Sequence, residues 1–120
     1  MDKAKQLCQE LGVSGNYALE LAENIVFLAD KLARTRALIN NMEVVIPYDN
    51  GGGQKGIREN PAFTAYEKLV RTYSKLVADF EAIAIAQGKN ILNVHAQIES
   101  VSTPISEMKK QFASNSIVKQ

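Results

Sequence analysis

A stretch near the middle of the chain, residues 44–61, cannot continue an α-helix. It contains an apolar β-branched run, four glycines and an Asn-Pro pair, all of which oppose helix formation. The runs Glu43 to Tyr48 and Gln54 to Arg58 are extended in character, and the glycines between them tolerate positive φ angles. The sequence therefore predicts that residues 43–60 form an extended insertion, a β-hairpin or long glycine loop, between two helices.

The first long helical pattern precedes this insertion, with Ser14 or Asn16 as its candidate N-cap. Apolar residues recur there in alternating steps of three and four, which is a heptad seam, and a second apolar row lies beside the seam. Such a broad apolar face predicts more than one packing neighbour. The seam comprises Ala18, Leu21, Ile25, Leu28, Leu32, Thr35, Ile39 and Met42, and the second row comprises Leu19, Ala22, Val26, Ala29 and Ala33.

The second long helical pattern follows the insertion. Asn60 is a good N-cap, and Pro61 lies at the first helical position, where proline is best tolerated. The pattern ends near Gly88, a residue suited to the position after a helix. Because the connection is short, the two helices are predicted to lie antiparallel as a coiled-coil-like helical hairpin. The second seam comprises Ala62, Tyr66, Leu69, Tyr73, Leu76, Phe80 and Ile83.

Shorter helical patterns flank the two long ones. Residues from Asp2 to Leu11 predict a short helix that ends at Gly12. The segments Ile91 to Val101 and Pro104 to about Phe112 predict two further helices. Residues 113–120 have no periodic pattern, so we expect them to form a frayed tail.

The composition is that of one ordinary folded domain, with 46% hydrophobic and 22% charged residues. The predicted fold class is mainly α: one helical domain, residues 1–112, around a central helical hairpin, residues 18–87. Fourteen Lys and Arg against 13 Asp and Glu give a net charge of +1, so overall charge favours neither nucleic acid nor an anionic membrane. No apolar run approaches the roughly 20 residues that span a bilayer, and residues 1–5 lack the apolar core of a signal peptide. We expect a cytoplasmic protein that does not contact membranes.

The glycine-rich stretch matches two phosphate-binding patterns only in part. Gly51, Gly53 and Gly56 fit G-x-G-x-x-G, but a dinucleotide site needs a βαβ unit and a parallel sheet, which this helical sequence does not predict. A phosphate-binding loop would require Lys and Ser or Thr where Ile57 and Arg58 stand. A flexible turn is therefore the better interpretation, and no cofactor is predicted.

Cys8 and His95 are the single cysteine and the single histidine of the chain. An intramolecular disulfide is therefore impossible, and no Cys/His metal cluster forms within one chain. The two residues remain an alternative nucleophile and base, but such pairs rarely act without a third, orienting group. We predict no catalytic residue, no metal and no enzymatic activity.

Five basic residues are the candidate phosphate contacts. Lys68, Arg71 and Lys75 recur at i, i+3 and i+7 on the side of the second helix opposite its seam, while Lys55 and Arg58 precede that helix in the loop. A solvated helix face is the competing interpretation, and we favour it because acidic residues of the same helix cancel the charge. Those acidic residues are Glu67, Asp79 and Glu81.

Two aromatic residues flank the insertion, Tyr48 and Phe63. Most other aromatic residues fall at seam spacing and are expected in the core. Tyr48 and Phe63 are instead candidate anchors for a protein partner, because buried aromatic side chains dominate many interfaces.

The segment Gly56-Ile57-Arg58-Glu59-Asn60-Pro61-Ala62-Phe63, followed by a helix with Tyr66, Leu69 and Leu76, resembles the central region of a family of tailed-phage terminase small subunits. The recurring feature is a glycine, a few residues, Asn-Pro-Ala and an amphipathic helix, and the resemblance covers roughly residues 18–87. It implies a helical hairpin that assembles into a homo-oligomer, with a ring as one form. It also implies a non-catalytic adaptor that binds double-stranded viral DNA and regulates the large terminase subunit in the host cytoplasm.

The sequence departs from that family in two places. About 17 residues precede the first long helix, too few for the helix-turn-helix of many terminase small subunits. After Gly88 the chain reads Lys-Asn-Ile-Leu in place of a Leu-Thr-Pro continuation. A different class also matches the architecture: a coiled-coil hairpin with a β-element at its turn resembles a prefoldin-type chaperone or adaptor subunit, which would hold unfolded protein.

Overall fold

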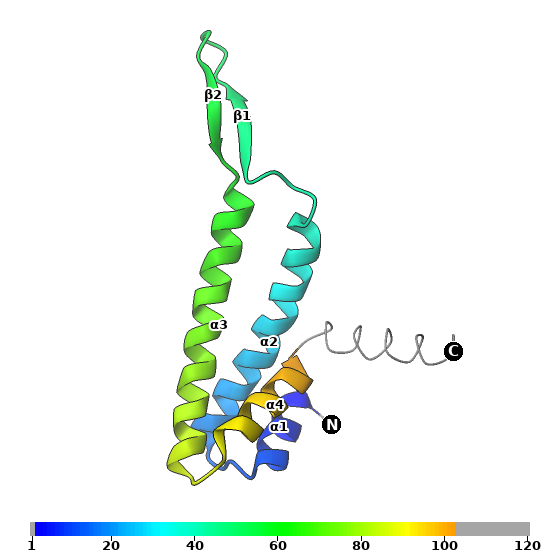
Figure 1. The fold of residues 1–120 in the computed structure, drawn as a ribbon, viewed down its shortest axis with the longest axis vertical. Helices are drawn as coiled ribbons and strands as arrows, with labels where there is room; N and C mark the ends of the chain where they lie inside the picture. The colour runs from blue at the N-terminus through cyan, green and yellow to red at the C-terminus, as the bar shows by residue number, and fades with distance from the viewer. Residues whose placement is uncertain (1, 103–120) are drawn as a thin grey trace, which may run out of the picture.

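The computed structural model describes residues 2–102 and is mainly helical, with one small two-stranded antiparallel sheet in that part of the chain (Figure 1). The predicted fold class is confirmed at this level. The predicted helix from Pro104 and the predicted tail lie outside the described residues. In chain order the elements are α1 (Lys3–Leu11), α2 (Asn16–Ile39), β1 (Val45–Asp49), β2 (Lys55–Glu59), α3 (Pro61–Ala86) and α4 (Ile91–Ser102).

The two long helices α2 and α3 contact one another, and the β-hairpin that connects them projects from one end of the pair (Figure 1). The short helices α1 and α4 lie at the opposite end, where α1 packs on α2 and α4 contacts all three other helices. We call these two regions the hairpin end (residues 36–66) and the base (α1, α4 and the neighbouring parts of α2 and α3). None of the described helices combines the length and the apolar character needed to cross a lipid bilayer.

Local signals set most helix boundaries, as the sequence predicts. The Asp2 carboxylate accepts a hydrogen bond from the Ala4 amide at 2.8 Å, and α1 ends at Gly12 with a φ of 70°. At α3, the Asn60 side chain accepts from the Ala62 amide at 3.0 Å, with Pro61 as the first helical residue. These contacts satisfy peptide groups that a helix end leaves unpaired.

The predicted N-cap of α2 is wrong. Asn16 is the first residue of the helix, so Gly15 occupies the N-cap position. Glycine has no side chain, and no side-chain hydrogen bond caps the helix. The peptide group of Ser14 bonds the Gln87 side chain instead, so a contact between distant segments replaces the expected local cap. The helix also ends earlier than its seam implies, at Ile39, which leaves Met42 beyond it.

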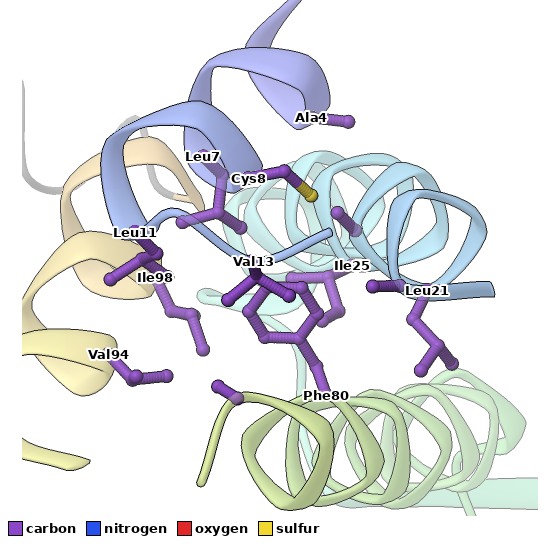
Figure 2. Packing of buried hydrophobic residues seen from close by; sticks show 13 residues of the cluster. Ala4, Leu7, Cys8, Leu11, Val13, Leu21, Ile25, Phe80, Val94 and Ile98 are labelled. Atoms are coloured by element: carbon purple, nitrogen blue, oxygen red, sulfur yellow. The ribbon is translucent and has the colours of Figure 1, made fainter. Parts of the chain in front are cut away.

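The core lies at the base, where four helices converge (Figure 2). The Phe80 ring points from α3 into a cluster of apolar side chains from α1, α2 and α4, and it has no exposed surface. Leu7, Ile25 and Val94 are the other large side chains that are completely buried. Each comes from a different helix, so burial of this cluster holds all four helices together.

Packing thins toward the hairpin end. Phe80 and Ala84 are the buried residues of α3, whereas the seam residues nearer its start, such as Leu69, are only half-buried. Ile39 is buried at the end of α2, but Met42 is 46% exposed. The seam residues therefore form a closed core only where α1 and α4 cover them.

Candidate functional site

The hairpin end carries the residues that the sequence singles out. Strand β1 pairs with β2 in antiparallel register, with Pro47 opposite Ile57 and Tyr48 opposite Gly56. Successive side chains of a strand point to opposite faces. One face of the hairpin therefore carries Val45, Pro47, Asp49, Lys55, Ile57 and Glu59, and the other carries Ile46, Tyr48, Gly56 and Arg58.

Lys55 and Arg58 lie in strand β2, not in an irregular loop, and three positions separate them. Because side chains alternate, the two basic groups project from opposite faces of the hairpin. Lys55 Nζ is 3.9 Å from Asp49 Oδ2, in a pair with both side chains largely exposed. The hairpin thus offers one basic group on each face and does not gather both into one patch.

Lys68, Arg71 and Lys75 are all exposed on α3, as their spacing predicts. Arg71 Nη2 is 2.5 Å from Glu67 Oε1, one turn earlier in the same helix. Such exposed i,i+4 pairs are weak and exchange readily with solvent or another anion. The α3 stripe (Lys68, Arg71 and Lys75) is therefore available to an anionic partner, and Glu67 competes for its central member.

Tyr48 and Phe63, the two candidate anchors, lie in different settings. The Tyr48 ring covers Gly56 on the facing strand, where an added Cβ would come within 2.8 Å of the ring atom Cε1. A side chain at position 56 would require the Tyr48 ring to move. Tyr48 is still 43% exposed. Phe63 is half-buried in the first turns of α3 and lines a groove against the end of α2.

This groove has a volume of about 400 Å³ and separates the end of α2 from the start of α3. Arg36 spans it: Nε and Nη2 donate hydrogen bonds to the Tyr66 hydroxyl at 2.9 and 2.7 Å. Both side chains are held in place, and the rest of the lining is mostly apolar. The lining residues are Arg36, Ile39, Asn40, Met42, Val44, Phe63 and Tyr66.

Sequence reasoning missed Arg36 and assigned Tyr66 only to the seam. Arg36 lies outside both apolar rows, and its partner is 30 residues away, so no local pattern links the two. The sequence therefore held no signal for this contact.

Large apolar side chains are exposed along the molecule, most densely at the hairpin end. Leu38 and Ile57 expose 72% and 71% of their surface. The exposed set at the hairpin end is Leu38, Met42, Val44, Val45, Tyr48 and Ile57, and Tyr17, Phe27, Val70, Ile85 and Leu92 lie elsewhere.

Cys8 and His95 have separate roles in the structure. Burial raises the pKa of the Cys8 thiol, and the negative charge of Glu23 raises it further. A protonated, buried thiol is a poor nucleophile. His95 Nε2 lies 2.8 Å from Glu81 Oε1, which joins α4 to α3. These contacts give both residues a structural explanation.

Within residues 2–102, no group of three or more His, Cys, Asp or Glu side chains is arranged to hold a metal ion. Comparison of the chain with protein-family models, with curated proteins and with solved structures finds no match in any of the three. The geometry of the chain itself must therefore support any functional proposal.

Proposed function

We propose that this chain is the small subunit of a tailed-phage terminase. In this role it is a non-catalytic adaptor in the host cytoplasm that binds double-stranded DNA and regulates the large terminase subunit. We further propose that α2 and α3 act as a coiled-coil-like helical hairpin, the unit from which a homo-oligomer, such as a ring, is built.

The observation that carries the proposal is the position of the motif behind the family resemblance. The segment from Gly56 to Phe63 comprises most of β2, the cap residue Asn60 and the start of α3, the junction where the β-hairpin joins the long helix. Gly56 accommodates the Tyr48 ring, and Asn60 caps α3. Gly56 and Asn60 therefore each have a structural task at this junction, which supports the proposal that the motif is a folding unit.

The basic groups favour DNA only when many copies act together. The α3 stripe is exposed but partly neutralised by Glu67, and Lys55 and Arg58 point to different faces. An oligomer repeats each weak phosphate contact, and simultaneous contacts multiply affinity through effective concentration. Binding of this kind depends on salt and is largely indifferent to DNA sequence.

The exposed apolar side chains supply the surface for self-association. Phe27 and Leu38 lie on α2 outside both predicted apolar rows, and each exposes more than half of its surface. We therefore expect a stable oligomer at tens of micromolar, the range in which a moderate interface is populated. Light scattering that gave the mass of a monomer there would contradict the ring model.

A chaperone or protein adaptor of the prefoldin type is the second candidate, because the groove and the exposed apolar side chains of the hairpin end suit a protein client. One paired experiment separates the two functions. Duplex DNA binding is measured by fluorescence anisotropy, and suppression of aggregation is measured with a heat-unfolded test protein. A packaging adaptor binds DNA and leaves aggregation unchanged, whereas a chaperone gives the opposite pair of results.

A further inference from the structure

The two outer edges of the β-hairpin differ in their free hydrogen-bonding groups. The Asn60 amide donates to the Val44 carbonyl at 2.7 Å, and the Asn50 amide donates to the Gln54 carbonyl at 3.2 Å. In an antiparallel ladder, hydrogen-bonded and non-hydrogen-bonded pairs alternate. Counting inward from these two bonds, the peptide groups of alternate residues in each strand point away from the other strand. They belong to Val45, Pro47 and Asp49 in β1 and to Lys55, Ile57 and Glu59 in β2.

The outer edge of β1 is closed to a further strand. Its central outward residue is Pro47, which has no N–H to donate, and a proline at this place protects an edge from pairing. The outer edge of β2 has no such block. Its central outward residue is Ile57, a β-branched side chain that is 71% exposed. Strand β2 is therefore the edge at which the sheet can grow.

We propose that β2 pairs antiparallel with β2 of a second copy of this chain, around a two-fold axis at Ile57, and so forms a four-stranded sheet. The register follows from the sequence of the strand, Lys-Gly-Ile-Arg-Glu. With Ile57 opposite Ile57 of the second copy, Lys55 lies opposite Glu59 of that copy, and Glu59 lies opposite its Lys55. In this register the outward peptide groups of Lys55, Ile57 and Glu59 all form hydrogen-bonded pairs with the second copy.

Charge complementarity identifies a second copy as the occupant of this edge. Opposite charges that face one another across antiparallel strands stabilise the pair, and here both ends of the strand satisfy this condition at once. Lys55 and Glu59 are also on the same face as Ile57, so the two attractive pairs flank one apolar contact. An isolated two-stranded hairpin is only marginally stable in water, and a third and fourth strand would stabilise it.

The existing contacts of these two side chains do not prevent the pairing. Lys55 Nζ is 3.9 Å from Asp49 Oδ2, and Glu59 Oε1 accepts from the Thr64 hydroxyl at 3.2 Å. The first contact is long and exposed, and the second uses one carboxylate oxygen and leaves the other free. Neither contact involves the outward peptide groups.

The symmetry of the contact limits what it can build. A two-fold contact uses the same edge on both copies and is complete with two chains. A ring made through strands would require the β1 edge, which Pro47 blocks. Any ring must therefore use the helices, and strand pairing would link the copies in pairs.

The strand pairing does not rest on the packaging function. The two proposals are tested by different measurements, because strand pairing changes the mass of the protein in solution whereas packaging requires DNA binding.

A charge-exchange experiment tests the register. In Lys55→Glu, positions 55 and 59 are both acidic, and in Glu59→Lys both are basic, so each variant alone places like charges opposite one another. We expect each single variant to weaken self-association roughly tenfold or more, since two facing pairs change from attraction to repulsion. An equimolar mixture of the two variants restores both attractive pairs and should recover association. Sedimentation velocity measures the masses, and Lys3→Glu, which makes the same charge change at an exposed position of α1, is the matched control.

A cross-linking experiment tests the same axis directly. Hydrogen-bonded partners in antiparallel strands have Cα atoms about 5.5 Å apart, which suits a disulfide. Ile57→Cys in a Cys8→Ala background should give a covalent dimer under mild oxidation. Lys55→Cys in the same background should not, because position 55 would lie about 13 Å from its own copy.

The results that overturn the proposal are a monomeric parent chain at tens of micromolar, single charge variants that associate like the parent, a mixture that stays dissociated, or equal cross-linking at positions 55 and 57. Circular dichroism of each variant checks that the helices remain folded. Because all the substituted strand residues are exposed, we expect no loss of helix.

Discussion

The side-chain amide of Gln87 forms two hydrogen bonds with the main chain of Ser14. Gln87 Oε1 accepts from the Ser14 amide at 2.9 Å, and Gln87 Nε2 donates to the Ser14 carbonyl at 2.8 Å. The side-chain amide thus pairs with both main-chain groups of Ser14, in the turn between α1 and α2, as a neighbouring β-strand would. This contact fixes the turn against the end of α3, 73 residues later in the chain.

Gln87→Ala should lower the free energy of unfolding by about 1–2 kcal/mol, because two hydrogen bonds are lost at a site that water still reaches. Urea denaturation followed by circular dichroism measures the loss. Gln9→Ala, on an exposed position of α1, is the matched control and should change stability by less than about 0.5 kcal/mol. Equal effects of the two substitutions would show that the bidentate contact contributes nothing.

Phe80→Ala and Leu69→Ala compare the two ends of α3. Phe80 is completely buried at the base, whereas Leu69 is half-buried toward the hairpin end. We expect a loss of about 3–5 kcal/mol for Phe80→Ala and a distinctly smaller loss for Leu69→Ala, because a cavity forms only where packing is closed. Phe80→Leu supplies a milder variant for the case in which Phe80→Ala does not fold. Similar losses at both positions would contradict a core confined to the base.

Asn60 joins the hairpin to α3 through both atoms of its amide. Oδ1 accepts from the Ala62 amide at 3.0 Å, and Nδ2 donates to the Glu43 carbonyl at 3.1 Å. Asn60→Asp retains the cap and loses the donor, while Asn60→Ala loses both. Thermal unfolding should rank the free energies of unfolding as parent, Asn60→Asp and Asn60→Ala, with a total loss of about 1–2 kcal/mol. If the aspartate variant were as unstable as the alanine variant, the cap would not be the stabilising contact.

The Cys8 thiol should react slowly in the folded protein. Its pKa is raised by burial and by Glu23, so less thiolate is present at pH 8 than for a free cysteine, and the core also blocks access. Labelling with iodoacetamide, followed by mass spectrometry, should be at least tenfold slower in buffer than in denaturing urea. Fast labelling of the folded chain would contradict the buried position.

The sequence predicts elements whose signals are local. Asn60 with Pro61 marks the start of α3, and Gly12 marks the end of α1, because a cap or a positive φ angle depends on neighbouring residues alone. The hairpin is also predictable from its glycines. Each of these features is decided within a few residues of chain.

Features that depend on distant contacts were not predictable. Ser14 bonds Gln87 rather than capping α2, and Arg36 meets Tyr66 across the groove. Periodicity alone predicts equal burial along each seam. In the structure Phe80 is buried and Leu69 is only half-buried, because α1 and α4 cover the helices at the base alone. Lys55 and Arg58 could be assigned to opposite faces only once residues 55–59 were seen to form a strand, since side chains do not alternate regularly in a loop.

The measurement that tests the packaging proposal most directly is duplex DNA binding by fluorescence anisotropy at about 50 and 200 mM salt. Several phosphate contacts should cost orders of magnitude in affinity over this range. Replacing Lys68, Arg71 and Lys75 together with Ala should abolish binding and leave the fold intact, because all three are exposed. The matched control replaces three exposed basic residues elsewhere, Lys3, Lys5 and Arg34. We expect salt-sensitive binding that only the α3 stripe variant loses. No binding at about 50 mM salt, or binding that survives in that variant, would contradict the packaging proposal.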